Sequence, residues 1–66
     1  MNISVNGENR AIEANSNLAQ LLEALDLQGK RIAVEVNRDI VPRSEYGSFV
    51  LSDNDQVEIV NAIGGG

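Results

Sequence analysis

The chain ends in Ile63-Gly64-Gly65-Gly66, and its terminal carboxylate is the group with the clearest chemistry. Glycine has no Cβ atom, so a tail of this kind could thread a narrow channel in another protein and pair there in extended form. The carboxylate of Gly66 is ionised at neutral pH. It could attack the α-phosphate of ATP to give an acyl-adenylate, a mixed anhydride that a nucleophile can reach without a β-substituent in the way. The tail therefore indicates carboxylate activation followed by acyl transfer.

The rest of the composition indicates that the catalytic groups belong to another protein. Among 66 residues there is no Cys and no His. The usual general base near neutral pH is therefore absent, as are a cysteine nucleophile, a disulfide and a thiolate metal site. We expect a single domain that is a protein co-substrate rather than an enzyme, with no cofactor or metal of its own.

The net charge and the hydropathy restrict the classes of partner and the cellular location that we expect. Ten acidic residues against five basic ones give a net charge of −5, which disfavours binding to nucleic acid and favours basic partner surfaces. The same charge is equally consistent with a role in solubility alone. No apolar run approaches the roughly 20 residues of a membrane span. We expect a cytoplasmic protein that does not bind membranes and is a monomer when alone.

Two further groups of residues could carry chemistry but have plainer explanations. Asp53 and Asp55 could suggest a metal site, although a turn stabilised by their side chains is the better interpretation. Arg43 could contact a partner, although a solvated arginine in a turn fits as well. The glycine tail itself could be an idle, solvated chain end.

The elements that would position the tail can be predicted from periodicity and turn residues. Ile3 and Val5 alternate with polar residues, Asn6-Gly7 is a strong hairpin turn, and residues 10–13 would return as a second strand. A helix is predicted over residues 18–27, capped by Asn17 and Gln20 and stopped at Gly29. Four leucines at helical spacing form its apolar stripe: Leu18, Leu21, Leu22 and Leu25.

Further strands follow at residues 32–37, at Ile40-Val41 before Pro42, and at residues 57–60. One sheet face must cover the leucine stripe. The residues that can supply it are Ile3, Val5, Ile32, Val34, Val36, Val57 and Ile59. This pattern predicts an α+β two-layer roll, a mixed sheet of four to five strands with one main helix. With the first and last strands as parallel neighbours it is the β-grasp, or ubiquitin-like, architecture. Residues 1–63 would form the domain and residues 64–66 a flexible tail.

The last strand also predicts a docking surface. Val60 and Ala62 have the opposite parity from Val57 and Ile59, so they should face away from the helix, beside Ser4 and Ala33. Together with Ile63 they would form a small apolar surface beside the tail, suited to a partner. Scattered exposed apolar residues are an equally good interpretation.

Several stretches resemble the thiamine-biosynthesis sulfur carriers of the ThiS family. They are Val36-Asn37-Arg38-Asp39-Ile40-Val41-Pro42-Arg43, Tyr46, the run from Asp53 to Val60, and Ile63-Gly64-Gly65-Gly66. The resemblance covers the whole chain in length and order. One departure is Asn54, where the family often has Gly, and Asn also tolerates a left-handed turn.

The resemblance implies partners and a role for the tail. An E1-like adenylyltransferase, called ThiF, would use ATP and magnesium to adenylate Gly66. Sulfur from a donor such as a cysteine desulfurase would then make a thiocarboxylate there. Thiazole synthase, called ThiG, would receive that sulfur, and Gly64 and Gly65 would occupy the partner's channel.

Three alternatives stay open at this point. The chain could be a sulfur carrier of the molybdopterin-synthase small-subunit type, although that family is usually longer. It could be a conjugated protein modifier, or a β-grasp interaction module without sulfur transfer.

Overall fold

A computed structural model describes residues 1–61, and the predicted glycine tail at Gly64, Gly65 and Gly66 lies outside the described residues. The described part contains five strands, one α-helix and one 3-10 turn. In chain order they are β1 (Asn2–Val5), β2 (Glu8–Ala11), α1 (Leu18–Ala24), β3 (Ile32–Val36), β4 (Asp39–Val41), η1 (Arg43–Glu45) and β5 (Gln56–Asn61).

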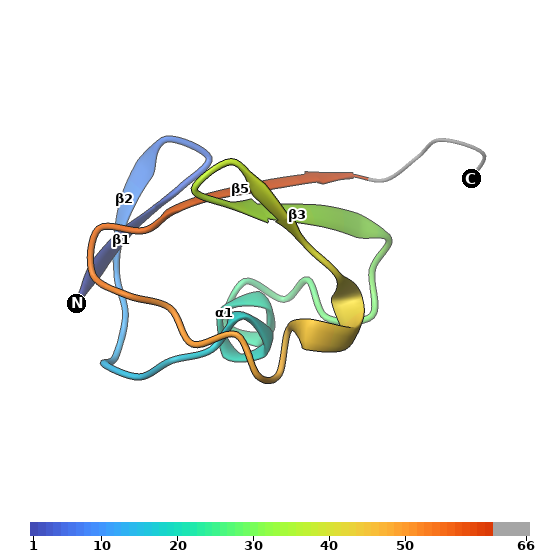
Figure 1. Cartoon of the computed structure of the whole chain (residues 1–66), viewed down its shortest axis with the longest axis horizontal. Helices are drawn as coiled ribbons and strands as arrows, with labels where there is room; N and C mark the ends of the chain where they lie inside the picture. The colour runs from blue at the N-terminus through green and yellow to red at the C-terminus, as the bar shows by residue number, and fades with distance from the viewer. Residues whose placement is uncertain (62–66) are drawn as a thin grey trace.

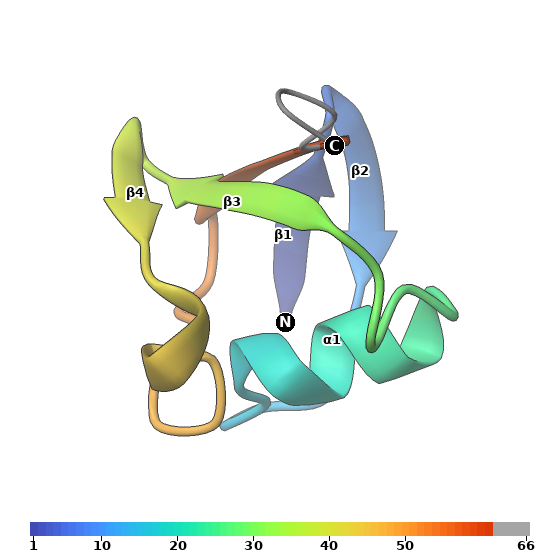
Figure 2. The same cartoon turned by 90° about the vertical axis from the view of Figure 1, so that its right-hand side faces the viewer.

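The strands form one mixed sheet in the order β2-β1-β5-β3-β4. Strands β1 and β5 are parallel neighbours, while the other pairs are antiparallel. Helix α1 crosses one face of this sheet (Figures 1 and 2). The structure thus confirms the α+β roll with a mixed sheet and the parallel pairing of the first and last strands.

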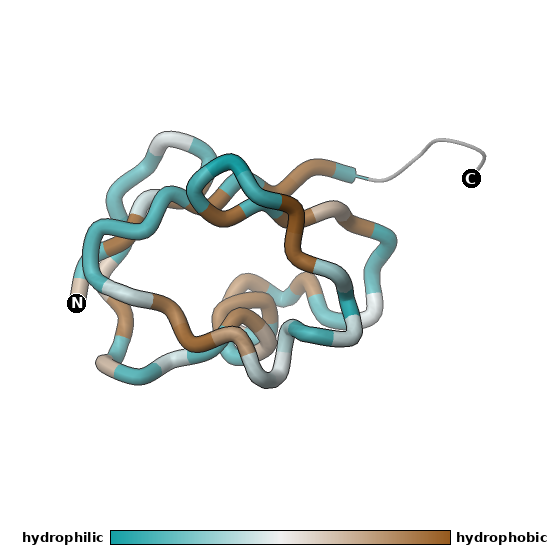
Figure 3. The backbone as a smooth tube through the Cα atoms, viewed as in Figure 1, coloured by the Kyte–Doolittle hydropathy of each residue, from teal (hydrophilic) through white to brown (hydrophobic). Residues whose placement is uncertain are grey.

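The core lies between α1 and the sheet. Hydrophobic segments occur on both the strands and the helix, and the connecting turns are mostly polar (Figure 3). The buried apolar residues are Ile3, Leu18, Leu21, Leu22, Ile32, Val34, Val36, Val41, Leu51, Val57 and Ile59. Two residues expected in this core, Val5 and Leu25, are only half-buried. Two others, Val41 and Leu51, complete the core from the edge strand and from a loop.

Helix α1 begins as expected and ends earlier. The Oδ1 atom of Asn17 accepts from the backbone N–H of Gln20 at 2.8 Å, and the side chain of Gln20 returns the bond at 2.8 Å. The predicted end at residue 27, with Gly29 as the stop, is wrong. The helix stops at Ala24, and Asp26 takes the left-handed conformation with φ 61°.

The reason is a Schellman motif that closes one turn earlier. The N–H of Leu27 bonds to the carbonyl of Leu22 at 2.8 Å, and that of Asp26 bonds to Glu23 at 3.0 Å. Gly29 also has positive φ, but in the following loop.

Tight turns set the register of both hairpins. Asn6 and Gly7 have φ of 51° and 84°, and Asn37 and Arg38 have φ of 52° and 74°. Positive φ at both central residues suits the right-handed twist of the flanking strands. The second strand runs over Glu8–Ala11 rather than residues 10–13, because a two-residue turn restarts pairing at once.

Candidate functional site

Strand β5 is the element that leads to the predicted tail. It lies in the middle of the sheet, between β1 and β3, and its last residue is Asn61. Opposite it on β3, Ala33 pairs with Val60 and Ile32 pairs with Asn61. The chain therefore leaves the described domain from a central strand whose direction is set by its neighbours.

The sheet face opposite α1 carries an exposed apolar group beside that exit. Val60 is 59% exposed, and Ile40 on β4 is 71% exposed. Val60 lies across from half-buried Ala33. Ser4, expected beside Val60, pairs instead with Gln56. The docking role of Val60 stays a prediction, and Ala62 and Ile63 lie outside the described residues.

Two carboxylates flank this apolar group. Glu35 and Glu58 are direct partners across the antiparallel pair β3 and β5. Together with Ala33 and Val60 they line a shallow hollow of about 190 Å³. Like charges directly opposite one another destabilise a sheet, and a cation placed between them relieves the repulsion. This outer face therefore combines apolar surface with a place for an arginine or lysine of a partner.

The aspartates of the turn before β5 have structural roles. Asp53 accepts from the backbone N–H of Asn2 at 2.8 Å. Asp55 accepts from the N–H of Ser52 at 2.8 Å and from the side chain of Asn37 at 3.0 Å. These bonds tie the turn to β1 and to the β3–β4 hairpin. Within residues 1–61 no group of three or more His, Cys, Asp or Glu side chains could hold a metal ion.

Arg43 also has a structural contact. Its Nη2 atom donates to the carbonyl of Lys30 at 3.0 Å and so connects η1 to the α1–β3 loop. Tyr46 is half-buried nearby and packs against the core, as does Phe49. These residues lie on the side of the sheet that faces α1, away from the outer face of β3 and β5.

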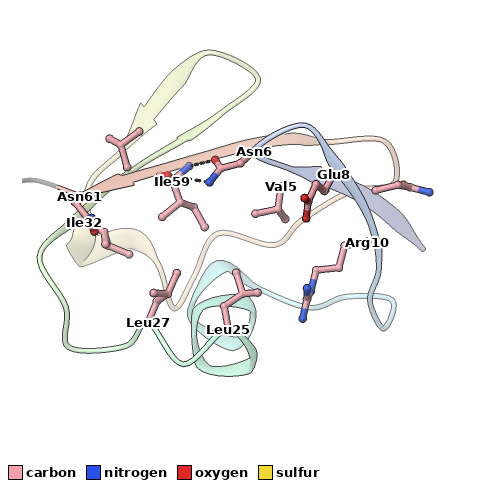
Figure 4. Close-up of a pocket in the computed structure, with 11 residues that line it drawn as sticks. Val5, Asn6, Glu8, Arg10, Leu25, Leu27, Ile32, Ile59 and Asn61 are labelled. Carbon is pink, nitrogen blue, oxygen red and sulfur yellow. Dashed lines mark hydrogen bonds between the residues drawn. The ribbon is translucent and has the colours of Figure 1, made fainter.

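A larger hollow, open to solvent, lies on the helix side of the sheet, at the end where β5 finishes. It has a volume of about 480 Å³. Its apolar wall includes Leu25, Leu27 and Ile32, and its rim includes Asn6 and Asn61 (Figure 4). The short helix explains this hollow, because α1 stops before it covers the ends of β1 and β5.

Sequence reasoning missed the second role of Asn6, which it assigned only to the turn. The Oδ1 atom of Asn6 accepts from the N–H of Ile59 at 2.7 Å, and its Nδ2 atom donates to the carbonyl of Ile59 at 3.1 Å. The two residues are far apart in the chain, so periodicity gave no signal. The only local hint is the asparagine at the first position of the turn. It follows β1, which is shorter than its neighbour β5.

Comparison with known proteins identifies relatives over the full chain. Residues 3–66 match the protein-family model described as ThiS family. The chain is 32% identical to the sulfur carrier protein ThiS of Escherichia coli, covering 100% of both chains. A crystal structure of the thiamine biosynthesis protein ThiS from Geobacter metallireducens superposes with a TM-score of 0.87 at 32% identity, again over 100% of both chains.

A second kind of relative is much longer. The chain is 44% identical over its whole length to a thiazole synthase of Magnetococcus marinus, of which it covers 20%. It likewise spans 20% of a thiazole synthase of Paramagnetospirillum magneticum, at 41% identity. Within residues 1–61, no helix is long and apolar enough to cross a membrane.

Proposed function

The chain belongs to the ThiS family, and from that premise we propose that it carries sulfur for thiamine biosynthesis as a thiocarboxylate on Gly66. The observation that carries the proposal is the family match, which extends from residue 3 through the terminal glycine. The chain is then a carrier protein, a substrate of other enzymes and not an enzyme itself.

The proposed chemistry has two stages. An oxygen of the Gly66 carboxylate attacks the α-phosphorus of ATP, and pyrophosphate leaves. The persulfide of a cysteine desulfurase then attacks the acyl carbon, AMP leaves, and an acyl disulfide forms. A thiol of a partner protein attacks the desulfurase sulfur of this acyl disulfide, forms a disulfide with it and releases the thiocarboxylate on Gly66. The absence of Cys and His from the chain supports the view that a partner supplies the catalytic groups, ATP and magnesium. Gly64 and Gly65 leave room for the partner's channel to close around the tail.

Thiazole synthase is the partner with the most support. Two proteins of that name contain, in a fifth of their length, a stretch similar to the whole of this chain. Carrier and acceptor joined in one polypeptide meet at a high effective concentration, which is useful when one must deliver sulfur to the other. We assign an E1-like adenylyltransferase as the second partner, and the cytoplasm, where both enzymes and ATP meet, as the location.

The outer face of β3 and β5 is the docking surface that fits this role. Val60 is exposed there beside the exit of the tail, with Ala62 and Ile63 next in the chain. A partner with an apolar patch and one basic side chain would cover Val60 and relieve the repulsion between Glu35 and Glu58. Docking of this kind would bring Gly66 to a fixed place in the partner.

The decisive experiment is incubation with the adenylyltransferase, ATP, magnesium and a sulfur donor, followed by intact mass spectrometry. Replacement of one oxygen by sulfur in the wild-type chain, mapped to Gly66, is the expected result. A matched variant that lacks Gly65 and Gly66 should keep its mass. Transfer to thiazole synthase, measured as thiazole formation, then distinguishes this carrier from one of the molybdopterin-synthase type.

Other mass patterns would favour the other functions. Conjugates in which Gly66 is joined to lysines of other proteins would indicate a protein modifier. A mass that stays unchanged with active partner enzymes would leave only a β-grasp interaction module.

A further inference from the structure

Strand β1 is shorter than the strand it must support. It ends at Val5, because Asn6 and Gly7 turn the chain back into β2. The last backbone bond from this side of β1 runs from the N–H of Asn6 to the carbonyl of Val57 at 2.9 Å. Strand β5, however, continues to Asn61. The N–H and carbonyl of Ile59 therefore face a position where β1 has no further backbone to offer.

The side chain of Asn6 fills that position. Its carboxamide has the same donor and acceptor as a peptide group, and it makes both bonds to Ile59, at 2.7 Å and 3.1 Å (Figure 4). The pairing of β5 with the β1 side is thus extended by one step beyond the end of β1. We call this pair of bonds the Asn6 clamp.

The Asn6 clamp is important for the stability of β5 because its two hydrogen bonds are part-buried. Ile59 is only 8% exposed, so water can replace a lost partner of its backbone groups only in part. Buried polar backbone groups without a partner are strongly disfavoured. Asparagine also tolerates the left-handed backbone that this turn requires, with φ 51°. One residue therefore forms the turn and supports the strand that leads to the tail.

We propose that Asn6 is a positioning residue for the carboxyl terminus: its side chain holds the end of β5 in the sheet and so aims the following residues at the partner's active site. This inference rests on the proposed function. Ile59 lies two positions before Asn61, the last described residue, and a tilt of β5 at this point would move everything beyond it. Reactions that depend on placement lose about a hundredfold in rate for a displacement near 1 Å.

The test removes the clamp without straining the turn. Asn6→Gly deletes the carboxamide, and glycine accepts positive φ at no steric cost. Asn15→Gly is the matched control, because Asn15 is exposed and also has positive φ, 67°, in the loop before α1. Hydrogen exchange measures the clamp directly. The Ile59 amide should exchange roughly tenfold faster in Asn6→Gly than in wild type. This increase in rate should exceed the increase at the core amide of Val34.

A second variant separates lost hydrogen bonding from lost bulk. Asn6→Asp keeps the shape and the acceptor but replaces the Nδ2 donor with oxygen. At neutral pH its Ile59 exchange should lie between wild type and Asn6→Gly, because the carboxylate still accepts from the Ile59 N–H but cannot donate to the Ile59 carbonyl. Below about pH 4 the carboxyl group is protonated and can donate again, so the difference from wild type should narrow.

Adenylation kinetics at a temperature where all variants are folded test the functional claim. We expect Asn6→Gly to lower kcat by about tenfold or more and to change KM less than kcat, because no residue of the docking face is replaced. Asn15→Gly should match wild type in both.

Unchanged Ile59 exchange, or an unchanged kcat in Asn6→Gly while wild type turns over, overturns the positioning role. Failure of the wild-type chain to be adenylated would instead overturn the proposed function, and this inference with it.

Discussion

Val60 occupies an unusual place for a large apolar side chain. It is 59% exposed on a central strand, while Val57 and Ile59, which have the inward parity, belong to the core. Half-buried Ala33 lies directly across from Val60 on β3. The paired carboxylates of Glu35 and Glu58 lie two residues away along the same two strands. The partner that we propose for this face would cover both the valine and the repelling pair.

Substitution of Val60 tests this at the scale of one side chain. Val60→Asp should weaken binding to thiazole synthase or to the adenylyltransferase by about tenfold or more, because an unpaired charge would be desolvated at the interface. The cost to folding should stay below about 1.5 kcal/mol, since the site is exposed. Titration calorimetry and a chemical melt measure the two effects.

Val50→Asp is the matched control, because Val50 is 55% exposed but lies outside the strands of the sheet. Equal affinities for all three proteins would place the docking face elsewhere.

Helix α1 shows how a short element is held in place by its ends and one face. It has seven residues, too few to be stable alone. A capping box closes its start and a Schellman motif its end, and Leu18, Leu21 and Leu22 are buried against the sheet. The helix therefore depends on tertiary packing, and it ends where the leucines stop being fully covered.

The leucine stripe gives a graded prediction. Leu22→Ala should destabilise the fold by about 2–5 kcal/mol, because Leu22 is 3% exposed and leaves a cavity. In a domain of this size such a loss unfolds much of the population. Leu25→Ala should cost less, since Leu25 is only half-buried beside the open hollow. Urea melts of both variants test the order, and a smaller loss for Leu22→Ala would mean that the stripe is misassigned.

The helix end offers a stabilising change. Asp26 adopts φ 61° at the position where glycine is preferred, and it brings a negative charge to the negative end of the helix. Asp26→Gly should therefore raise the free energy of unfolding by about 0.5–1 kcal/mol. Thermal melts in low salt are the measurement. A fall in the melting temperature would show that the aspartate side chain stabilises the loop in a way its backbone position does not indicate.

At the scale of the whole molecule, the fold separates its two ends. Met1 lies just before β1 at one end of the domain, and β5 finishes at the other end (Figure 1). The amino group of Met1 donates to the carbonyl of Ile12 at 2.7 Å. A residue added before Met1 converts this group to an amide that still has an N–H for Ile12. The amino end is therefore the tolerant end for tags.

Changes at the carboxyl end should act on activation and not on folding. One bulky residue added after Gly66, or deletion of Gly65 and Gly66, should abolish adenylation by moving the carboxylate off its required position. The melting curve should not change, because Gly65 and Gly66 have no side chains to bury. Pyrophosphate release by the activating enzyme compares carboxyl-terminally and amino-terminally tagged protein. Equal turnover of the two would argue against a carrier that works through Gly66.

Local sequence determined most of the elements of this protein. Alternation at Ile3 and Val5, the Asn6-Gly7 turn and the Asn17–Gln20 capping box are local patterns, and the structure has each of them. Parity alone was enough to turn Val60 outward. These features follow from interactions between residues a few positions apart, which a sequence displays directly.

Tertiary structure decided what depends on distant parts of the chain. It set the end of α1 at Ala24, because full burial of the leucine stripe against the sheet stops at Leu22 and Leu25 is only half-buried. Leu51 entered the core from a loop with no periodicity to indicate it. The bonds between Asn6 and Ile59 exist only because β1 and β5 are parallel neighbours of unequal length, a relation that the folded sheet creates and that neither segment contains by itself.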